Sequence, residues 1–165
     1  MDVRIRPMNA ADKTAVMIIL NNTPEFPPSD VVVAEELIDS YLHDPSGSGY
    51  HIVVSEDDYA IAGYACYGPT PLTEGTWDLY WIAVEHSRQG QGIGGALMEF
   101  VEGWIREEKG RMLLIETSSK PDYEKTRNFY HNFGYEEVCC IPDFYTPGDS
   151  KVVFIKRFDH TDTNA

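Results

Sequence analysis

The pattern of hydrophobic and polar residues predicts strands and helices that follow one another along the chain. Residues 3–6 alternate apolar and basic side chains, which predicts a strand that ends at the following proline. Apolar residues at helical spacing over 15–20 predict a helix capped by Asn9, and residues 30–42 predict a second helix. Three prolines lie within 22–29, so we expect no regular structure there.

The remainder of the chain carries the signals of six further strands and two further helices. Gly110 is expected to end the first of these helices as its C-cap. Prolines and a glycine over 142–149 predict a connection between the last two strands. The expected strands are 51–54, 60–67, 77–84, 111–117, 135–141 and 151–158, and the expected helices are 96–106 and 122–133. No repeat or linker interrupts this order, which predicts one α/β domain over 1–158 and a disordered polar tail over 159–165.

A glycine-rich stretch joins the strand that ends at Val84 to the helix over 96–106. Glycines recur at 90, 92, 94 and 95. Glycine lets backbone amides approach a ligand without a Cβ in the way. The start of a helix also offers unpaired N–H groups and a partial positive charge, which favour phosphate. The stretch therefore predicts a cradle for a diphosphate.

Three interpretations of this cradle compete. It is a tight turn that needs small residues, a dinucleotide site, or a coenzyme A site. Gly90, Gly92 and Gly95 match the dinucleotide pattern G-x-G-x-x-G, but that pattern should follow its strand directly and open a domain. Here residues 85–89 intervene and most strands come earlier, so the dinucleotide interpretation is disfavoured.

Two motifs resemble the GNAT superfamily of N-acetyltransferases. Gln89-x-x-Gly92-x-Gly94, shortly after Val84, resembles its acyl-CoA signature Q/R-x-x-G-x-G/A. Residues 128–135, which read NFYHNFGY, are similar to its F-Y-x-x-x-G-F/Y segment. The resemblance covers about 77–158. It implies the GNAT fold of the α/β (α+β) class: a twisted, mostly antiparallel sheet of six to seven strands, flanked by about four helices, with a parallel pairing where the central strands splay apart.

The resemblance also implies a site for acetyl-CoA, with main-chain groups of the bulged central strand binding the pantetheine arm and the thioester carbonyl. Tyr130 matches the tyrosine that faces the coenzyme sulfur and acts as an acid, although packing in the core is the alternative. Tyr123 stands where the family often has asparagine, on the same helix. The implied coenzyme-binding residues are Ile82, Ala83, Val84, Gln89, Gly90, Gln91, Gly92, Ile93, Gly94, Gly95, Tyr123 and Tyr130.

A general base is also needed, because an alkylammonium with a pKa near ~10 must lose a proton before it attacks a thioester. Glu116 ranks first: it ends an apolar strand, and either faces solvent or is buried with a raised pKa. Asp78 ranks second, since other members place an acidic residue there, and a water relay is the third option. The resemblance places Phe26 and Tyr145 beside the acceptor, with plain packing as the alternative.

Composition narrows the function further. The formal net charge of −14 argues against nucleic acid as a partner. The three cysteines form no metal-ligand pattern, and we expect no metal cofactor. No apolar run could span a bilayer and no signal-peptide core begins the chain, so we expect a cytoplasmic protein without a membrane partner.

The sequence thus predicts an enzyme that moves an acetyl group from acetyl-CoA directly to a primary amine of a small molecule or peptide. A binding module that senses acyl-CoA without turnover is the alternative. A dinucleotide-dependent oxidoreductase is a distant third. Dimers are common for the fold that the resemblance implies, so a homodimer stays open.

Overall fold

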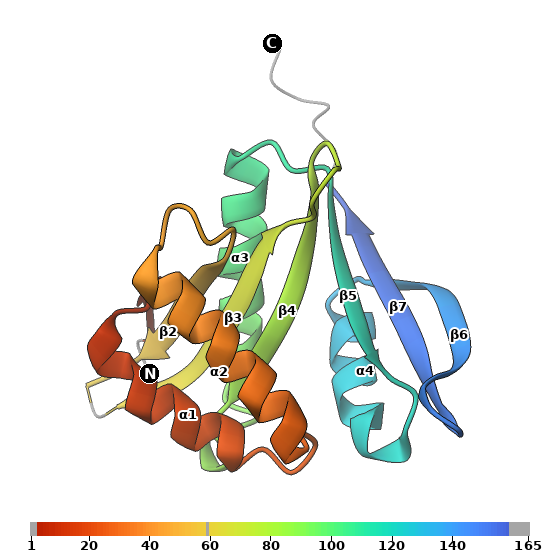
Figure 1. Cartoon of the computed structure of the whole chain (residues 1–165), viewed down its shortest axis with the longest axis horizontal. Helices are drawn as coiled ribbons and strands as arrows, with labels where there is room; N and C mark the ends of the chain where they lie inside the picture. The colour runs from red at the N-terminus through yellow and green to blue at the C-terminus, as the bar shows by residue number, and fades with distance from the viewer. Residues whose placement is uncertain (1–2, 59, 159–165) are drawn as a thin grey trace.

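The computed structural model describes residues 3–58 and 60–158, which form one mixed sheet with helices on both faces (Figure 1). The seven strands lie in the order β1-β2-β3-β4-β5-β7-β6. All neighbours are antiparallel except β4 and β5, which are parallel. The strands are β1 (Arg4–Pro7), β2 (His51–Glu56), β3 (Ile61–Pro69), β4 (Thr76–Val84), β5 (Met112–Ser118), β6 (Glu136–Thr146) and β7 (Asp149–Arg157), and the helices are α1 (Lys13–Asn21), α2 (Pro28–His43), α3 (Ile93–Glu107) and α4 (Glu124–Asn132). The expected α+β class, strand number and helix number are confirmed.

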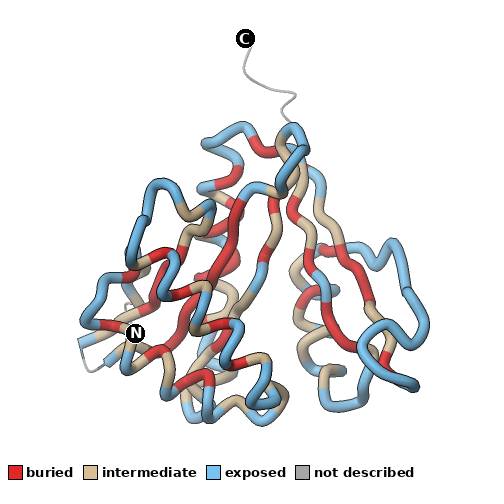
Figure 2. Tube along the Cα trace, in the orientation of Figure 1, coloured by how far each residue is buried: buried red, intermediate tan, exposed pale blue. Residues whose placement is uncertain are grey.

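Each face of the sheet has its own hydrophobic core. One core joins α1 and α2 to β2 and β3, and the other joins α3 and α4 to β3, β4, β5 and β7. Figure 2 shows the buried residues along the central strands and the inner sides of the helices. Because β3 is covered on both faces, seven consecutive residues of it are buried, and its sequence is nearly continuously apolar.

A β-bulge in β4 opens the centre of the sheet. Tyr67 of β3 pairs with Leu79, but the preceding Cys66 pairs with Trp81, so Tyr80 is the extra residue. The pairing of β4 with β5 ends at the same level, at Leu79 and Ile115. Beyond that level the two strands diverge, as the open V at the centre of Figure 1 shows. This splay is the feature that the resemblance implied.

The structure corrects two expected boundaries. Pro28 and Ser29 belong to α2, because proline is well tolerated in the first turn of a helix, where its missing N–H would have no helical partner. The connection expected over 142–149 is mostly strand, since β6 continues to Thr146 and only Pro147 and Gly148 turn the chain. The tail expected over 159–165 lies outside the described residues.

The end of α3 differs from the prediction by one residue. Lys109, not Gly110, adopts the left-handed conformation, with φ of 58°. The N–H of Lys109 donates to Arg106 at 3.0 Å and that of Gly110 donates to Ile105 at 2.8 Å, which is the Schellman arrangement. Glycine is instead needed at position 110 because there is no room for a side chain: a Cβ there would lie 2.4 Å from the side chain of Ile105.

Candidate active site

Main-chain groups of β4 face the splay at two positions. The N–H of Glu85 donates to the carbonyl of Ala62 at 2.8 Å, so Val84 and Gly63 form a pair that is not itself hydrogen-bonded. The N–H and carbonyl of Val84 therefore point away from β3, and those of Ile82 do the same because the pattern repeats every two residues. In the described part of the chain no strand pairs with β4 on that side beyond Leu79. The main chain of Ala83, between them, points toward β3.

The start of α3 offers uncapped amides. Gly92 is the N-cap, with φ of 85° and no side chain to cap the helix, and the first helical bond runs from Ala96 to Gly92 at 3.0 Å. The N–H groups of Ile93, Gly94 and Gly95 consequently have no partner within the helix. A Cβ at Gly90 or Gly92 would meet nothing within 4 Å, so their positive φ explains these glycines.

The other two glycines of the stretch lie against α4. A Cβ at Gly94 would be 3.5 Å from the ring of Phe129, and one at Gly95 would be 3.6 Å from Phe133. Gln89 extends the link across the splay, since its side chain accepts a hydrogen bond from Lys125 of α4 at 3.0 Å and donates to the carbonyl of Val84 at 3.4 Å. Gln91 stays at the exposed surface of the loop.

Tyr130 is buried between α4 and the sheet. Its ring contacts those of Phe129, Tyr135 and Phe154, with centroids 5.6, 6.2 and 5.8 Å away. Burial raises the pKa of the phenol above its usual range, so the group stays protonated at neutral pH. No hydrogen bond joins the Tyr130 hydroxyl to any residue that the structure describes.

The spacing of the Tyr130 motif has a structural cause. The N–H of Tyr135 donates to the carbonyl of Tyr130 at 3.0 Å, and the N–H of Gly134 donates to His131 at 3.0 Å. Gly134 has φ of 89°, as a Schellman turn requires, and Tyr135 packs back on Tyr130. Gly134, four residues after Tyr130, therefore ends α4, and the turn that it forms places Tyr135 against the ring of Tyr130.

Three charged side chains meet on the α2 side of the sheet. Asp78 of β4 is half-buried and accepts a hydrogen bond from Thr70 at 2.6 Å. Burial raises its pKa, and the nearby Glu116 adds to this while Thr70 and Lys151 oppose it. Glu116 of β5 is exposed and pairs with Lys151 of β7 at 2.8 Å. Of the two positions that the sequence left open for Glu116, the structure therefore has the exposed one.

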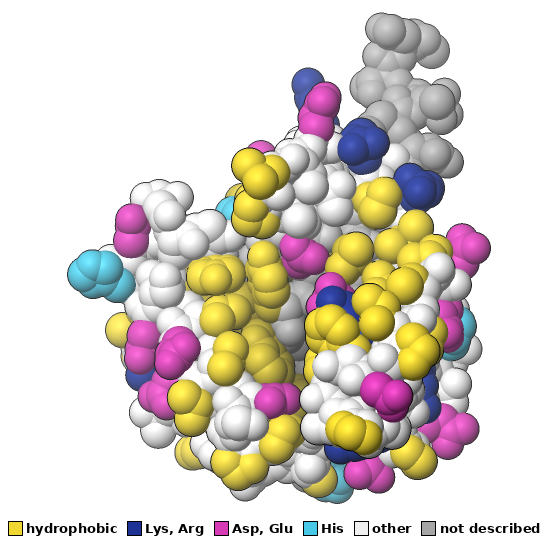
Figure 3. All heavy atoms as spheres, turned by 45° about the vertical axis from the view of Figure 1, so that its right-hand side comes forward, with side chains coloured by type: hydrophobic (Ala, Val, Ile, Leu, Met, Phe, Trp, Pro, Cys, Tyr) yellow, Lys and Arg dark blue, Asp and Glu magenta, His cyan; other side chains and the backbone are white. Residues whose placement is uncertain are grey.

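Aromatic side chains surround these charges from both sides of the splay. Phe26 meets Trp81 edge-on at 5.2 Å, and Tyr50 meets Tyr80 at 5.5 Å. On the opposite side, Tyr145 contacts Phe144 at 5.1 Å, and the ring of Phe144 lies 4.3 Å from the Lys151 ammonium. Figure 3 shows the molecule hollowed between these two halves, with hydrophobic side chains on both sides of the hollow.

Tyr123 lies in the short 3-10 turn Pro121–Tyr123 just before α4, and not on α4 itself as expected. Its hydroxyl donates to the main-chain carbonyl of Glu25 at 2.6 Å, so it links the turn before α4 to the loop between α1 and α2. Its pKa is raised to about 12, first by burial and then by Asp30, Glu25 and Asp149. Tyr123 therefore bridges the two halves of the molecule, and its contact with the coenzyme stays a prediction.

Sequence reasoning did not find Trp81, Tyr80, Thr70 or Lys151 as members of this region. The bulge explains one of them, because it turns Trp81 toward α2. Tyr80 lies beside Asp78 because alternate residues of a strand share a face. Lys151 is found only from the register of β7 against β5. The one signal in the sequence for these residues was the run of aromatic side chains before the glycine-rich stretch.

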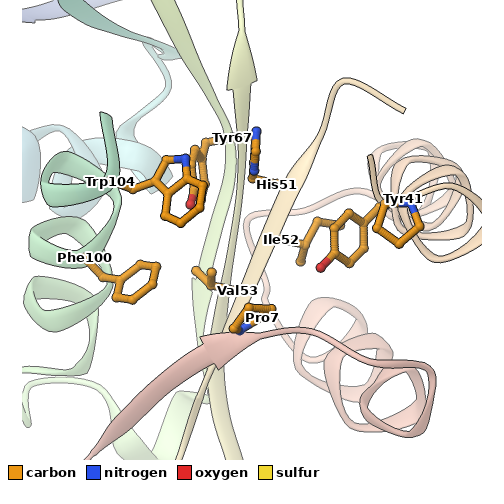
Figure 4. A pocket seen from close by; sticks show the side chains of 9 residues that line it. Pro7, Tyr41, His51, Ile52, Val53, Tyr67, Phe100 and Trp104 are labelled. Atoms are coloured by element: carbon orange, nitrogen blue, oxygen red, sulfur yellow. The ribbon is translucent and has the colours of Figure 1, made fainter. Parts of the chain in front are cut away.

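A second hollow of about 130 Å³ lies apart from the splay, beside the edge of β2 (Figure 4). Pro7, Tyr41, His51, Phe100 and Trp104 are among its lining residues, and none of the predicted site residues belongs to it. Burial lowers the pKa of His51, so this imidazole is neutral at pH 7. The residues that line this hollow offer no cradle for a diphosphate.

Within residues 3–58 and 60–158, no group of three or more His, Cys, Asp or Glu side chains could hold a metal ion. None of the helices described has the length and hydrophobicity needed to cross a bilayer.

Comparisons with known proteins agree with this geometry. The family model of the acetyltransferase (GNAT) domain matches residues 48–137, more than half of the chain. A crystal structure from Desulfovibrio desulfuricans, described as an acetyltransferase of the GNAT family, is 41% identical, with a TM-score of 0.91 over 94% of this chain and 99% of that one. A search of curated protein sequences finds no match.

More distant structures share the fold. The ribosomal-protein-S18-alanine N-acetyltransferase of Escherichia coli is 18% identical, with a TM-score of 0.76 over 99% of both chains. An aminoglycoside 6'-N-acetyltransferase complexed with coenzyme A is 20% identical, with a TM-score of 0.75 over 96% of this chain and 99% of that one. The family match, the identity of 41% and the splayed sheet together establish that this chain belongs to the GNAT family of acetyltransferases.

Proposed function

We propose that this protein transfers the acetyl group of acetyl-CoA to a primary amine on a small molecule or peptide that carries positive charge. One observation carries the proposal: the uncapped amides of α3, the main-chain groups of Ile82 and the N–H of Val84 open onto the same break in the sheet. A diphosphate fits the first group, since Gly90 and Gly92 leave open space where a Cβ would stand. An extended amide arm fits the second, as an added strand would.

Acetyl-CoA supplies a thioester, whose carbonyl carbon accepts the electron pair of the amine as the carbon–sulfur bond breaks. An N–H at Ile82 or Val84 would donate to the negative charge that develops on the carbonyl oxygen. The Tyr130 hydroxyl would donate to the departing sulfur. Because burial raises the pKa of this phenol, we assign it a hydrogen bond that stabilises the thiolate rather than complete proton transfer.

We assign the base to Asp78 ahead of Glu116. Asp78 is the half-buried carboxylate with the raised pKa, whereas Glu116 is exposed and neutralised by Lys151. The proton leaves the amine nitrogen and passes to Asp78, directly or through one water. A carboxylate with a raised pKa is the better acceptor of the two.

The charge around the hollow favours a cationic acceptor. The phenol of Tyr145 has its pKa raised to about 12, first by burial and then by Glu116, Asp149 and Asp30, which come from both halves of the molecule. Aromatic rings beside carboxylates favour alkylammonium groups. Phe26 and Tyr145 line the acceptor side in this proposal. The two distant relatives named above act, by their descriptions, on a ribosomal-protein alanine and on an aminoglycoside.

The test is thiol release from acetyl-CoA with a panel of amines: a monoamine, a diamine of equal length, an amino acid and a peptide with a free N-terminus. We expect turnover with at least one amine and a preference for the diamine over the monoamine. Tyr130→Phe should lower kcat about 100-fold while the Kd for acetyl-CoA stays within twofold. Binding of acetyl-CoA without turnover of any amine would instead support the acyl-CoA sensor. The homodimer stays a prediction, for which light scattering is the measurement.

A further inference from the structure

We infer that Glu102 is a positioning residue for catalysis, because it ties the helix that begins at the glycine cradle to the helix that carries Tyr130. This inference rests on the proposed role of Tyr130. Glu102 lies on the inner side of α3, and only 3% of its surface is exposed. A buried carboxylate is unfavourable unless its oxygens are bonded, so its partners indicate its role.

Three side chains donate to the Glu102 carboxylate. Lys156 of β7 lies 2.9 and 3.0 Å from its two oxygens, and Arg106 lies 3.1 Å from one of them. The hydroxyl of Tyr135, just after α4, donates at 3.0 Å. One carboxylate therefore joins α3, β7 and the segment that ends α4.

Lys156 adds a second connection to α4. Its ammonium donates to the carbonyl of Phe133, the C-cap of α4, at 3.0 Å. The carbonyl end of a helix carries partial negative charge, which favours a cation there. A Cβ at Gly134 would lie 3.8 Å from this ammonium, so the turn that ends α4 sits directly against it. Glu102 thus holds Lys156, and Lys156 holds the end of α4.

Tyr130 is attached to this same end. Its carbonyl accepts the N–H of Tyr135 at 3.0 Å and its ring packs on that of Tyr135, so a displacement of Tyr135 passes to Tyr130 directly. At the start of α3, Gly94 and Gly95 face the rings of Phe129 and Phe133. Glu102 joins the same two helices roughly two turns further along. Helices α3 and α4 are therefore held together at two levels: by the packing of rings against the glycines near the start of α3, and by the charged network around Glu102 further along.

The expected consequence is a loss of rate without a loss of coenzyme binding. Without the negative charge, the Lys156 ammonium and the Tyr135 hydroxyl lose their common partner, and the phenol of Tyr130 is less well placed. Small misplacements of a catalytic group lower kcat. The amides that would bind the diphosphate lie at the other end of α3 and keep their own contacts.

The test compares Glu102→Gln with Glu99→Gln, a matched control on the exposed side of the same helix. In protein shown to be folded by circular dichroism, we expect Glu102→Gln to lower kcat about 10-fold, with the Kd for acetyl-CoA within twofold. Glu99→Gln should change neither. Tyr135→Phe, which removes one donor and keeps the ring, should lower kcat in the same direction and replaces Glu102→Gln if that variant does not fold.

The Tyr130→Phe background separates positioning from a general effect. There, Glu102→Gln should lower kcat by less than twofold further, because the hydroxyl that it positions is already absent. The inference would be overturned if Glu102→Gln lowered kcat as much in the Tyr130→Phe background as in the wild type. It would also be overturned if folded Glu102→Gln had a kcat within twofold of wild type, or if its loss were confined to the KM for acetyl-CoA. If Tyr130→Phe itself retains the wild-type kcat, the acid role fails; if only Glu102→Gln does, the positioning role alone fails.

Discussion

Gly92 is the position at which the cradle can be tested with the least disturbance to the rest of the fold. It has φ of 85°, and a Cβ there would meet nothing within 4 Å, so Gly92→Ala changes backbone preference without a clash. The left-handed conformation costs an L-residue about 1–2 kcal/mol, which sets the upper limit of the loss of stability. For a chain of this length that corresponds to a fall in Tm of roughly 2–8 °C.

Ligand binding should suffer more than stability. Gly92 and its neighbours in the loop are exposed, so the loop can relax and move the amides of Ile93, Gly94 and Gly95. A hydrogen bond to a charged group contributes about 1.5–3 kcal/mol. Loss of one such bond would weaken acetyl-CoA binding by about 10- to 150-fold.

Gly103→Ala is the matched control. Gly103 lies in the middle of α3, where a Cβ would also meet nothing within 4 Å, and alanine there should stabilise the helix by about 0.5–1 kcal/mol. Calorimetric titration with acetyl-CoA and thermal unfolding of both variants complete the assay. Wild-type affinity in Gly92→Ala, or equal weakening in Gly103→Ala, would refute the role of the cradle amides.

Three further changes have defined outcomes. Asp78→Asn should lower kcat/KM about 100-fold and remove the acidic limb of the pH profile, in which activity rises with pH through the raised pKa of Asp78; a retained limb would exclude this base. Lys109→Gly should raise the free energy of unfolding by about 1 kcal/mol, because Lys109 has φ of 58°, whereas Lys109→Ala should not; equal urea midpoints would contradict this. Asp12→Asn should lower stability by about 2 kcal/mol at pH 7, since Arg6 lies 2.7 Å from this carboxylate and lowers its pKa. That contribution is present above the ordinary carboxyl pKa and is lost as pH falls through the lowered one, so the difference between Asp12→Asn and wild type should shrink toward pH 3 in acid titrations of stability.

Local features of the chain could be predicted because their causes are local. The start of α3 depends on glycines that adopt positive φ, and the end of α4 depends on Gly134, so both follow from a few adjacent residues. The succession of strands along the chain followed from apolar runs in the sequence. Gly110 shows the limit of this reasoning, because its role depends on the side chain of Ile105 and not on its own φ.

The environment of the site could not be predicted in the same way. Glu116 is exposed and pairs with Lys151, which reaches it only through the pairing of β5 with β7. The direction of Trp81 depends on a bulge that nothing in the sequence of β4 announces. The network around Glu102 joins residues up to 54 positions apart. These contacts are set by tertiary packing, so they required the structure.

The most direct measurement of the central claim is a calorimetric titration of the folded wild-type protein with acetyl-CoA. If the uncapped amides at the start of α3 and the main-chain groups of Ile82 and Val84 that face the splay form a coenzyme site, one equivalent should bind, and Gly92→Ala should bind more weakly. Absence of heat and of any shift in Tm in well-folded protein would contradict the account and leave only the architecture.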